Sequence, residues 1–145
     1  MELIHIVGAR PQFIKMASVS CAIAEHSQNR KVNSDEIHEL VVHTGQHYDY
    51  ELSEVFFHEL HIPKPHYDLE VGSASHGEQT GETLKRVEQV YFQEARDIIL
   101  AYGDTNTTLA GAFAAVKLHI PLAHVSLWIE KLGSNLWIGL VKLFC

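Results

Sequence analysis

The sequence contains only two cysteines, Cys21 and Cys145, among its 145 residues. Two cysteines so far apart do not make a disulfide framework, so we expect a protein of the reducing cytoplasm. The first residues lack the basic segment and apolar stretch of a signal peptide, and we expect none there. No apolar run is long enough to cross a bilayer, because the stretch 136–145 is short and contains Lys142. We therefore expect no association with membranes.

Basic residues are scarce as well. The chain has 11 Lys and Arg against 18 Asp and Glu, which gives a formal net charge of −7. A general nucleic-acid binder gains affinity by neutralising phosphates, so this charge argues against that class but leaves room for a pocket that holds one nucleotide. The sequence has neither a GxGxxG fingerprint nor a P-loop, which argues against NAD and ATP. His58, His61 and His66 flank prolines without metal-ligand spacing, so we expect no metal site.

Apolar strand patterns alternate with helical patterns along the chain. Hydrophobic residues make up 46% of the sequence, enough for a folded domain with a core. The predicted strands are Leu3–Val7, Glu39–His43, Tyr67–Leu69, Asp97–Tyr102 and Pro121–Val125. The predicted helices are Pro11–His26, Tyr50–Glu59, Ser75–Glu94 and Thr105–Lys117. This alternation favours the α/β class, with a doubly wound, Rossmann-like parallel sheet covered by helices on both faces.

Two segments give weaker patterns. In the first helix we expect inward-facing side chains at Ile14, Val19, Ala22 and Ile23, with Cys21 packed in the core. The tail 126–145 departs from the strand-then-helix pattern. Its apolar residues would line a helix, although glycines weaken that reading; these residues are Leu127, Trp128, Leu132, Leu136, Trp137 and Leu140. We therefore divide the chain into a Rossmann-like domain, 1–125, and an atypical apolar tail, 126–145.

The end of the first strand carries a candidate anion site. Gly8 and Ala9 precede Arg10, Pro11 opens a helix, and Lys15 follows within that helix. Proline suits the first helical turn, and the free amides and positive dipole end of the helix would face an anion above the strand. Arg10 and Lys15 would add two cations, so a phosphate group is the expected ligand. The alternative is a turn followed by a solvated helix face.

Two more strand ends carry polar clusters. In 43–47, Gly45 lies between side-chain donors and suits close approach to a ligand; the alternative is a turn with Thr44 as a cap. In 103–108, Asp104 would bind sugar hydroxyls or act as an acid or base, and Thr105 or Asn106 would cap the next helix. The alternative gives Asp104 the capping role alone. His124 lies near the end of the last predicted strand, and its side chain would face a ligand cleft at these strand ends.

These clusters, in this order, resemble a known family. The opening segment reads IVGARPQFIKMA, and the matching segments are Ile6–Ala17, His43–Asp49, Val71–Gly81, Tyr102–Gly111 and Ile120–Val125. Together they resemble the non-hydrolysing UDP-N-acetylglucosamine 2-epimerases over about residues 1–125. The resemblance implies the N-terminal domain of a glycosyltransferase-B-type fold, in which two Rossmann-like domains bind a UDP-sugar between them.

The resemblance also implies a reaction and a set of roles. UDP-GlcNAc and UDP-ManNAc would interconvert by loss of the C2 proton with elimination of UDP, followed by re-addition of UDP, without metal or nicotinamide cofactor. Arg10 and Lys15 would contact the diphosphate, and Asp104 would be a catalytic carboxylate. His124 and the pair Gln46 and His47 fall in matching segments and are expected to bind substrate. Gln46 and Asp49 lie where some bacterial members bind a second, activating UDP-GlcNAc. The resemblance also implies that the full-length protein is a homodimer.

The sequence departs from the family after Val125. Ser126 stands where the family has a glutamate used in acid-base chemistry, and the second domain does not follow. We therefore expect a truncated N-terminal half that is inactive alone. The alternatives are a catalytically silent UDP-sugar-binding or subunit-interaction module, and half of a hydrolysing epimerase or a glycosyltransferase.

Overall fold

The computed structural model describes residues 1–29, 36–45, 62–94, 96–132 and 135–144, with the backbone alone beyond Ser126. In these residues six strands form one sheet in the order β3-β2-β1-β4-β5-β6. The strands are β1 (Glu2–Val7), β2 (His38–His43), β3 (Tyr67–Asp68), β4 (Ile98–Tyr102), β5 (Leu122–Leu132) and β6 (Asn135–Phe144). Neighbouring strands from β3 to β5 pair in parallel, and β6 pairs antiparallel with β5. The Rossmann-like α/β prediction is confirmed.

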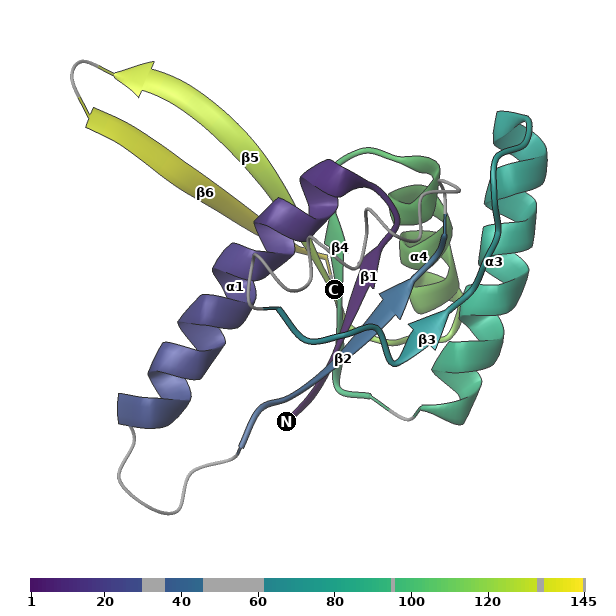
Figure 1. The fold of residues 1–145 in the computed structure, drawn as a ribbon, viewed down its shortest axis with the longest axis horizontal. Helices are drawn as coiled ribbons and strands as arrows, with labels where there is room; N and C mark the ends of the chain where they lie inside the picture. Colours follow the sequence, from purple (N-terminus) through teal and green to yellow (C-terminus); the bar gives the residue numbers. More distant parts are fainter. Residues whose placement is uncertain (30–35, 46–61, 95, 133–134, 145) are drawn as a thin grey trace.

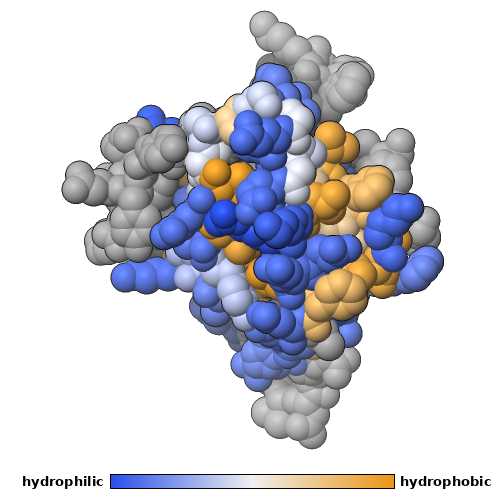
Figure 2. Space-filling view, turned by 90° about the vertical axis from the view of Figure 1, so that its right-hand side faces the viewer, coloured by the Kyte–Doolittle hydropathy of each residue, from blue (hydrophilic) through white to orange (hydrophobic). Residues whose placement is uncertain are grey.

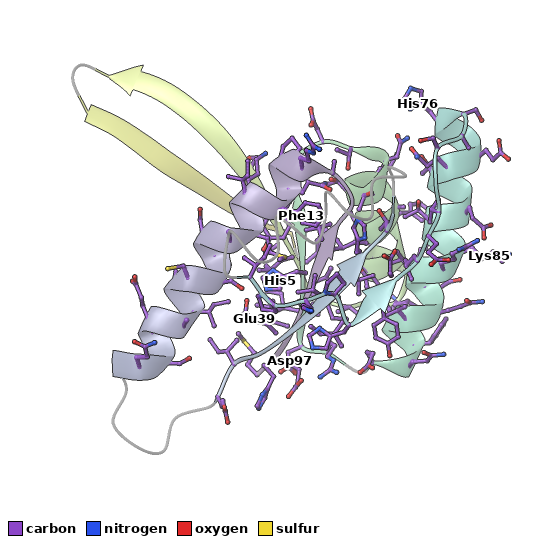
Figure 3. The ribbon with its side chains drawn as sticks, viewed as in Figure 1. His5, Phe13, Glu39, His76, Lys85 and Asp97 are labelled. Atoms are coloured by element: carbon purple, nitrogen blue, oxygen red, sulfur yellow. The ribbon has the colours of Figure 1, made fainter. Side chains whose placement is uncertain are left out.

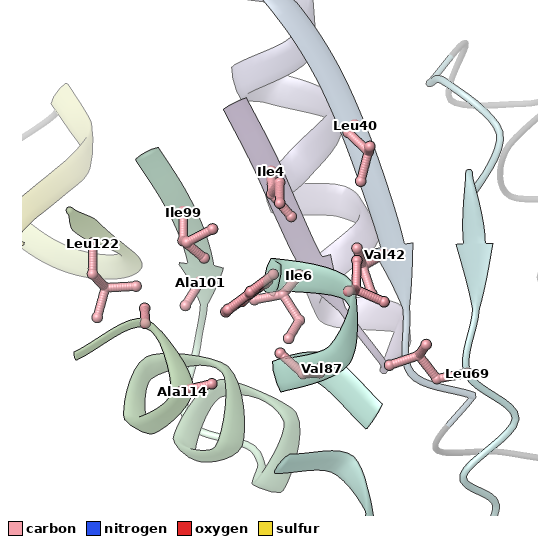
Figure 4. Packing of buried hydrophobic residues seen from close by; sticks show 13 residues of the cluster. Ile4, Ile6, Leu40, Val42, Leu69, Val87, Ile99, Ala101, Ala114 and Leu122 are labelled. Atoms are coloured by element: carbon pink, nitrogen blue, oxygen red, sulfur yellow. The ribbon is translucent and has the colours of Figure 1, made fainter. Parts of the chain in front are cut away.

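Helices cover both faces of the sheet. Helix α1 (Arg10–Asn29) lies on one face, and α3 (His76–Gln93) packs with α4 (Asn106–Lys117) on the other (Figure 1). Successive residues of a strand point to opposite faces, so β1 serves both layers. Ile4 and Ile6 pack toward α3 and α4 (Figure 4), while Leu3 and Val7 join the cluster that contains Phe13 and Met16 of α1. Because both faces are buried, the strands are apolar almost throughout.

The predicted inward face of α1 is partly wrong. Ile14 is 52% exposed, and Ala22 and Cys21 are exposed as well. Val19 and Ile23 are half-buried against the core. The buried positions of the helix are Gln12, Phe13, Met16 and Ser20. Polar residues take part in this stripe because they bond to neighbouring turns and strands, which the hydrophobic pattern does not reveal. In Figure 1 the last turns of α1 stand away from the sheet, and Ala22 and Ala24 are exposed there.

The helical reading of the tail is wrong. Strand β5 continues to Leu132, and β6 returns beside it, with an irregular register between Ser126 and Ile129 (Figure 1). Glycines at 133 and 139 disfavour a helix, and the aromatic and β-branched residues between them suit a strand. The predicted helix Tyr50–Glu59 lies outside the described residues.

Candidate functional site

The turns that follow β1, β2 and β4 lie at one edge of the sheet. The three strands are parallel and paired in register, with Val7 beside His43 and Ile6 beside Ala101. Helices α1 and α4 begin at this edge. In open α/β sheets, ligands bind outside the carboxyl ends of the strands. The predicted residues Arg10, Lys15 and Asp104 therefore belong to one edge rather than to separate surfaces.

Gln12 connects the turn after β1 with the turn after β4. Its side chain is 1% exposed, and its Oε1 accepts hydrogen bonds from the amides of Gly8 (2.7 Å) and Ala9 (3.0 Å). Its Nε2 donates to the carbonyl oxygen of Tyr102 (2.5 Å) and lies 2.9 Å from Thr105 Oγ1 and 3.0 Å from Thr108 Oγ1.

These bonds correct one prediction. The amides of Gly8 and Ala9 are not free for an anion, because Gln12 already occupies both. The backbone N–H of Gln12 itself donates to the Ala9 carbonyl at 2.9 Å. An anion at this turn would therefore be held mainly by the side chains of Arg10 and Lys15, and less by backbone amides than the sequence predicts. The sequence did contain a signal for Gln12, because a Gln at the third helical position commonly reaches back to the residue before the helix.

Gly8 lies where three turns meet. A β-carbon at this position would stand 2.2 Å from Thr44 Oγ1 and 2.3 Å from Thr107 Oγ1. The two threonine hydroxyls are joined to each other by a 2.8 Å hydrogen bond, and both residues are buried. Thr44 thus connects the end of β2 to the first turn of α4. Only glycine fits beneath this pair of hydroxyls.

Gly103 brings three predicted residues together. A β-carbon on Gly103 would lie 3.4 Å from Lys15 Nζ, so the ammonium group of α1 lies against the turn after β4. His124 Nε2 lies 2.5 Å from the Gly103 carbonyl oxygen; because a carbonyl only accepts, this nitrogen carries the proton. Gly103 has a φ of +67°, which favours glycine. Asp104 follows directly and is exposed.

Asp104 is not the cap of α4. Thr105 is the N-cap, and its hydroxyl accepts from the Thr108 amide in a reciprocal capping box. Of the two predicted caps, Thr105 is the N-cap and Asn106 is the first residue of the helix, and the alternative that gives Asp104 only a capping role is wrong. The exposed carboxylate is therefore available for contact with a ligand.

The other predicted positions differ in their surroundings. Arg10 is exposed at the start of α1. His43 is buried, lies 3.3 Å from Asp68 and is tilted against Phe13, which places it under the edge rather than on it. Gln46, His47 and Asp49 lie outside the described residues. His76, at the start of α3 in Figure 3, lies 3.1 Å from the side-chain nitrogen of Asn106 in α4.

A buried polar network lies beneath α1, close to the site. His5, labelled in Figure 3, contacts Tyr102 Oη with Nδ1 (2.5 Å) and Glu39 Oε1 with Nε2 (2.8 Å). Ser20 donates to the same carboxylate oxygen at 2.5 Å. Burial raises the pKa of Glu39, but the hydrogen bonds from His5 and Ser20 outweigh it and hold the pKa below its ordinary value. Burial also raises the pKa of Tyr102, which keeps its hydroxyl protonated.

A doubly wound parallel sheet with cationic and carboxylate side chains at its carboxyl edge defines a Rossmann-like ligand-binding domain. Comparison with known proteins gives the family. A family model described as UDP-N-acetylglucosamine 2-epimerase matches residues 30–126. The match spans more than half of the chain, and the protein belongs to this family.

Relatives agree with this assignment. A UDP-N-acetylglucosamine 2-epimerase homolog of Methanococcus maripaludis is 52% identical, over 94% of this chain and 35% of that protein. The UDP-2,3-diacetamido-2,3-dideoxy-D-glucuronate 2-epimerase of Pseudomonas aeruginosa is 49% identical, over 94% of this chain and 36% of that one. The crystal structure of Methanocaldococcus jannaschii UDP-GlcNAc 2-epimerase in complex with UDP-GlcNAc and UDP superposes with a TM-score of 0.77 at 40% identity, covering 90% of this chain and 34% of that one. The chain thus spans about a third of the length of these relatives.

Two further observations concern the described residues alone. None of their helices is both long enough and apolar enough to cross a membrane. Within the same part of the chain, no group of three or more His, Cys, Asp or Glu side chains is placed to hold a metal ion.

Proposed function

We propose that residues 1–125 form the UDP-sugar-binding domain of a non-hydrolysing UDP-N-acetylglucosamine 2-epimerase. The observation that carries the proposal is the convergence of Lys15, His124 and Asp104 on the turn at Gly103. A cation next to an exposed carboxylate suits a ligand in which a diphosphate is joined to a sugar.

Each residue has a role in the proposed reaction. Arg10 and Lys15 hold the diphosphate, and their charge stabilises UDP as it leaves C1 with the electron pair of the C1–O bond. Asp104 is one of the carboxylates that exchange the proton at C2. UDP then adds back to C1, and a proton returns to the other face of C2. These steps use no metal and no nicotinamide cofactor.

The chain alone binds nucleotide but turns over little substrate, on this proposal. Ser126 stands where the resembled family has a glutamate, and the chain spans about a third of its relatives. Gln46 and His47 remain predicted substrate contacts. The substrate is the small molecule UDP-GlcNAc or UDP-ManNAc rather than nucleic acid, and the proposed compartment is the cytoplasm, where the exposed Cys21 stays reduced.

Calorimetric titration with UDP tests the binding proposal. We expect Lys15→Ala and Arg10→Ala each to weaken UDP binding by roughly tenfold, because each removes a charge-assisted contact. Lys117→Ala is the matched control, since Lys117 lies over the ring of Phe113 at the far end of α4. Equal affinities for the wild type and both site variants would rule out this diphosphate site.

Proton exchange tests the catalytic part of the proposal. Incubation of UDP-GlcNAc with the chain in D₂O, followed by NMR at C2, should show little exchange. Rapid exchange that Asp104→Asn abolishes would mean that the chain is active by itself. A chain that binds UDP and shows no exchange even when the isolated second domain of a relative is added would favour the catalytically silent module instead.

A second substrate is favoured by one comparison. The Pseudomonas aeruginosa relative at 49% identity is named for a diacetamido glucuronate rather than for GlcNAc. Both sugars are linked to UDP, so the same diphosphate contacts would serve either. Saturation-transfer NMR with each UDP-sugar separates them, because the preferred one displaces UDP at lower concentration.

We also propose that the chain forms a homodimer through the outer face of α4. Leu109, Phe113 and Val116 lie at helical spacing and are 61%, 49% and 60% exposed, while the opposite face of α4 is buried. Figure 2 shows apolar side chains gathered beside the hydrophilic surface of α3. Sedimentation equilibrium should give a dimer that Phe113→Glu converts to a monomer. Ile14→Glu, an equally exposed position on α1, is the control and should leave the dimer intact.

A further inference from the structure

Gln12 uses its whole side-chain amide to join two turns. The oxygen has two lone pairs and receives two backbone N–H groups, those of Gly8 and Ala9. The nitrogen faces one carbonyl and two hydroxyl oxygens, with the carbonyl of Tyr102 nearest at 2.5 Å. The orientation of the amide follows from these partners, since the backbone N–H groups require an acceptor and the carbonyl requires a donor.

The connection begins where the sheet ladder stops. The parallel register between β1 and β4 ends at Ile6 and Ala101. Beyond that point each strand runs into a turn, and Gln12 bonds to both turns. Thr108 strengthens the second half of the connection, because its hydroxyl donates to the same Tyr102 carbonyl at 2.6 Å.

The two turns carry different parts of the proposed site. The first leads into α1 with Arg10 and Lys15, and the second carries Asp104. A relative shift of these turns would change the distance between the diphosphate-binding cations and the carboxylate. A polar side chain that is almost fully buried and satisfied on both sides fixes such a distance more firmly than apolar packing would.

We propose that Gln12 is a positioning residue that sets the separation between the diphosphate-binding side chains and Asp104. This inference rests on the proposed function, because the diphosphate gives the separation its purpose. Gln12 acts only through the two turns, with its amide turned toward the protein interior.

The test compares UDP binding by the full chain and by Gln12→Glu, Gln12→Ala and Gln28→Ala at about pH 6 and about pH 8. A Glu carboxylate still accepts the two amides but, when ionised, cannot donate to Tyr102 O. Because position 12 is buried beside this carbonyl, the pKa of the introduced carboxyl is raised from about 4.3 toward neutral pH, so the two pH values bracket its protonation. We expect Gln12→Glu to bind UDP roughly tenfold more weakly than wild type at the higher pH and to recover toward wild type at the lower pH. Gln12→Ala should be weak at both. Gln28, exposed near the end of α1, is the control for an ordinary Gln-to-Ala change.

The outcomes separate the two claims. If the wild type binds UDP and both Gln12 variants bind equally well, the positioning role is wrong and the proposed function stands. If the wild type does not bind UDP, the proposed function is wrong and the positioning role falls with it. If Gln12→Ala does not fold, the ratio of Gln12→Glu to wild-type affinity at the two pH values decides, because a loss of packing alone gives a ratio that does not change with pH.

Discussion

His124 Nε2 donates to the carbonyl oxygen of Gly103 at 2.5 Å, and this bond fixes the turn that carries Asp104 against the end of β5. The amide of Gly103 also donates to the Val125 carbonyl at 3.0 Å. Gly103 is thus held from the β5 side by both its carbonyl and its amide, while Lys15 approaches from α1. The position of the Asp104 carboxylate therefore depends on β5. Of the β5 residues that pair with β4, His124 is the only one with an ionisable side chain.

Replacing His124 should lower the free energy of UDP binding by more than it lowers the free energy of unfolding. His124→Ala leaves the Gly103 carbonyl without its side-chain donor, which costs about 1 kcal/mol of stability. His124→Gln, which keeps a donor, should restore part of the UDP affinity. Urea unfolding and calorimetry on the same samples measure both effects. An affinity that follows stability in both variants would contradict a specific role in holding the turn.

Gly8→Ala should be severely destabilising. The new methyl group would overlap the paired hydroxyls of Thr44 and Thr107, so the loss should exceed roughly 2 kcal/mol. Gly81→Ala is the matched control, because a β-carbon at that helical position meets nothing within 4 Å and should stabilise the chain by up to about 1 kcal/mol. Thermal unfolding of the two variants should therefore move in opposite directions from the wild type.

The pH dependence of stability should report on Glu39. Its pKa is held below the ordinary value of 4.5 in the folded chain, so its contribution is present above that value and is lost as the pH falls through the folded pKa. Urea midpoints measured from neutral to acidic pH should fall in the wild type. Glu39→Gln should lower the midpoint at neutral pH and flatten this acid limb. Glu25→Gln, at an exposed position of α1, should leave the limb unchanged.

Shortening the chain should spare nucleotide binding. Strand β5 pairs with β4 over Leu122–Val125, and β6 lies on its other side, paired with it from Leu122 to Leu132. A chain that ends at Leu132 keeps the parallel sheet and the turn at Gly103. We expect it to unfold cooperatively and to bind UDP within about threefold of the full chain. Loss of binding would show that β6 supports the site, contrary to the division at residue 125.

Much of the fold can be predicted from the sequence because apolar strand patterns and helical patterns alternate clearly along the chain. The predicted strand Leu3–Val7 differs by one residue from β1, and the helix predicted at Thr105–Lys117 is α4 with Thr105 as its cap. The prediction fails in the tail because its apolar residues fit a helix as well as a strand, and the pairing of β6 with β5 decides between them.

The site was only partly predictable. Its residues follow from the rule that parallel strands end at one edge, which brings Lys15, Asp104 and His124 together. The bonds of Gln12 to Tyr102 and Thr108 join residues about 90 positions apart, and no local pattern encodes such partners. The same holds for the hydroxyl pair above Gly8, which a sequence shows only as separate threonines.

The contacts around Gly8 also determine at what stage of synthesis and folding the site can form. Its turn is completed by Thr44 and by Thr107, and Gln12 finds its last partner at Thr108. During synthesis, a ribosome-bound chain that has not yet extended past α4 has the first strand and helix but no closed edge. Assembly of the edge must therefore wait for most of the domain, and contacts of such long range make that step slow compared with formation of the helices.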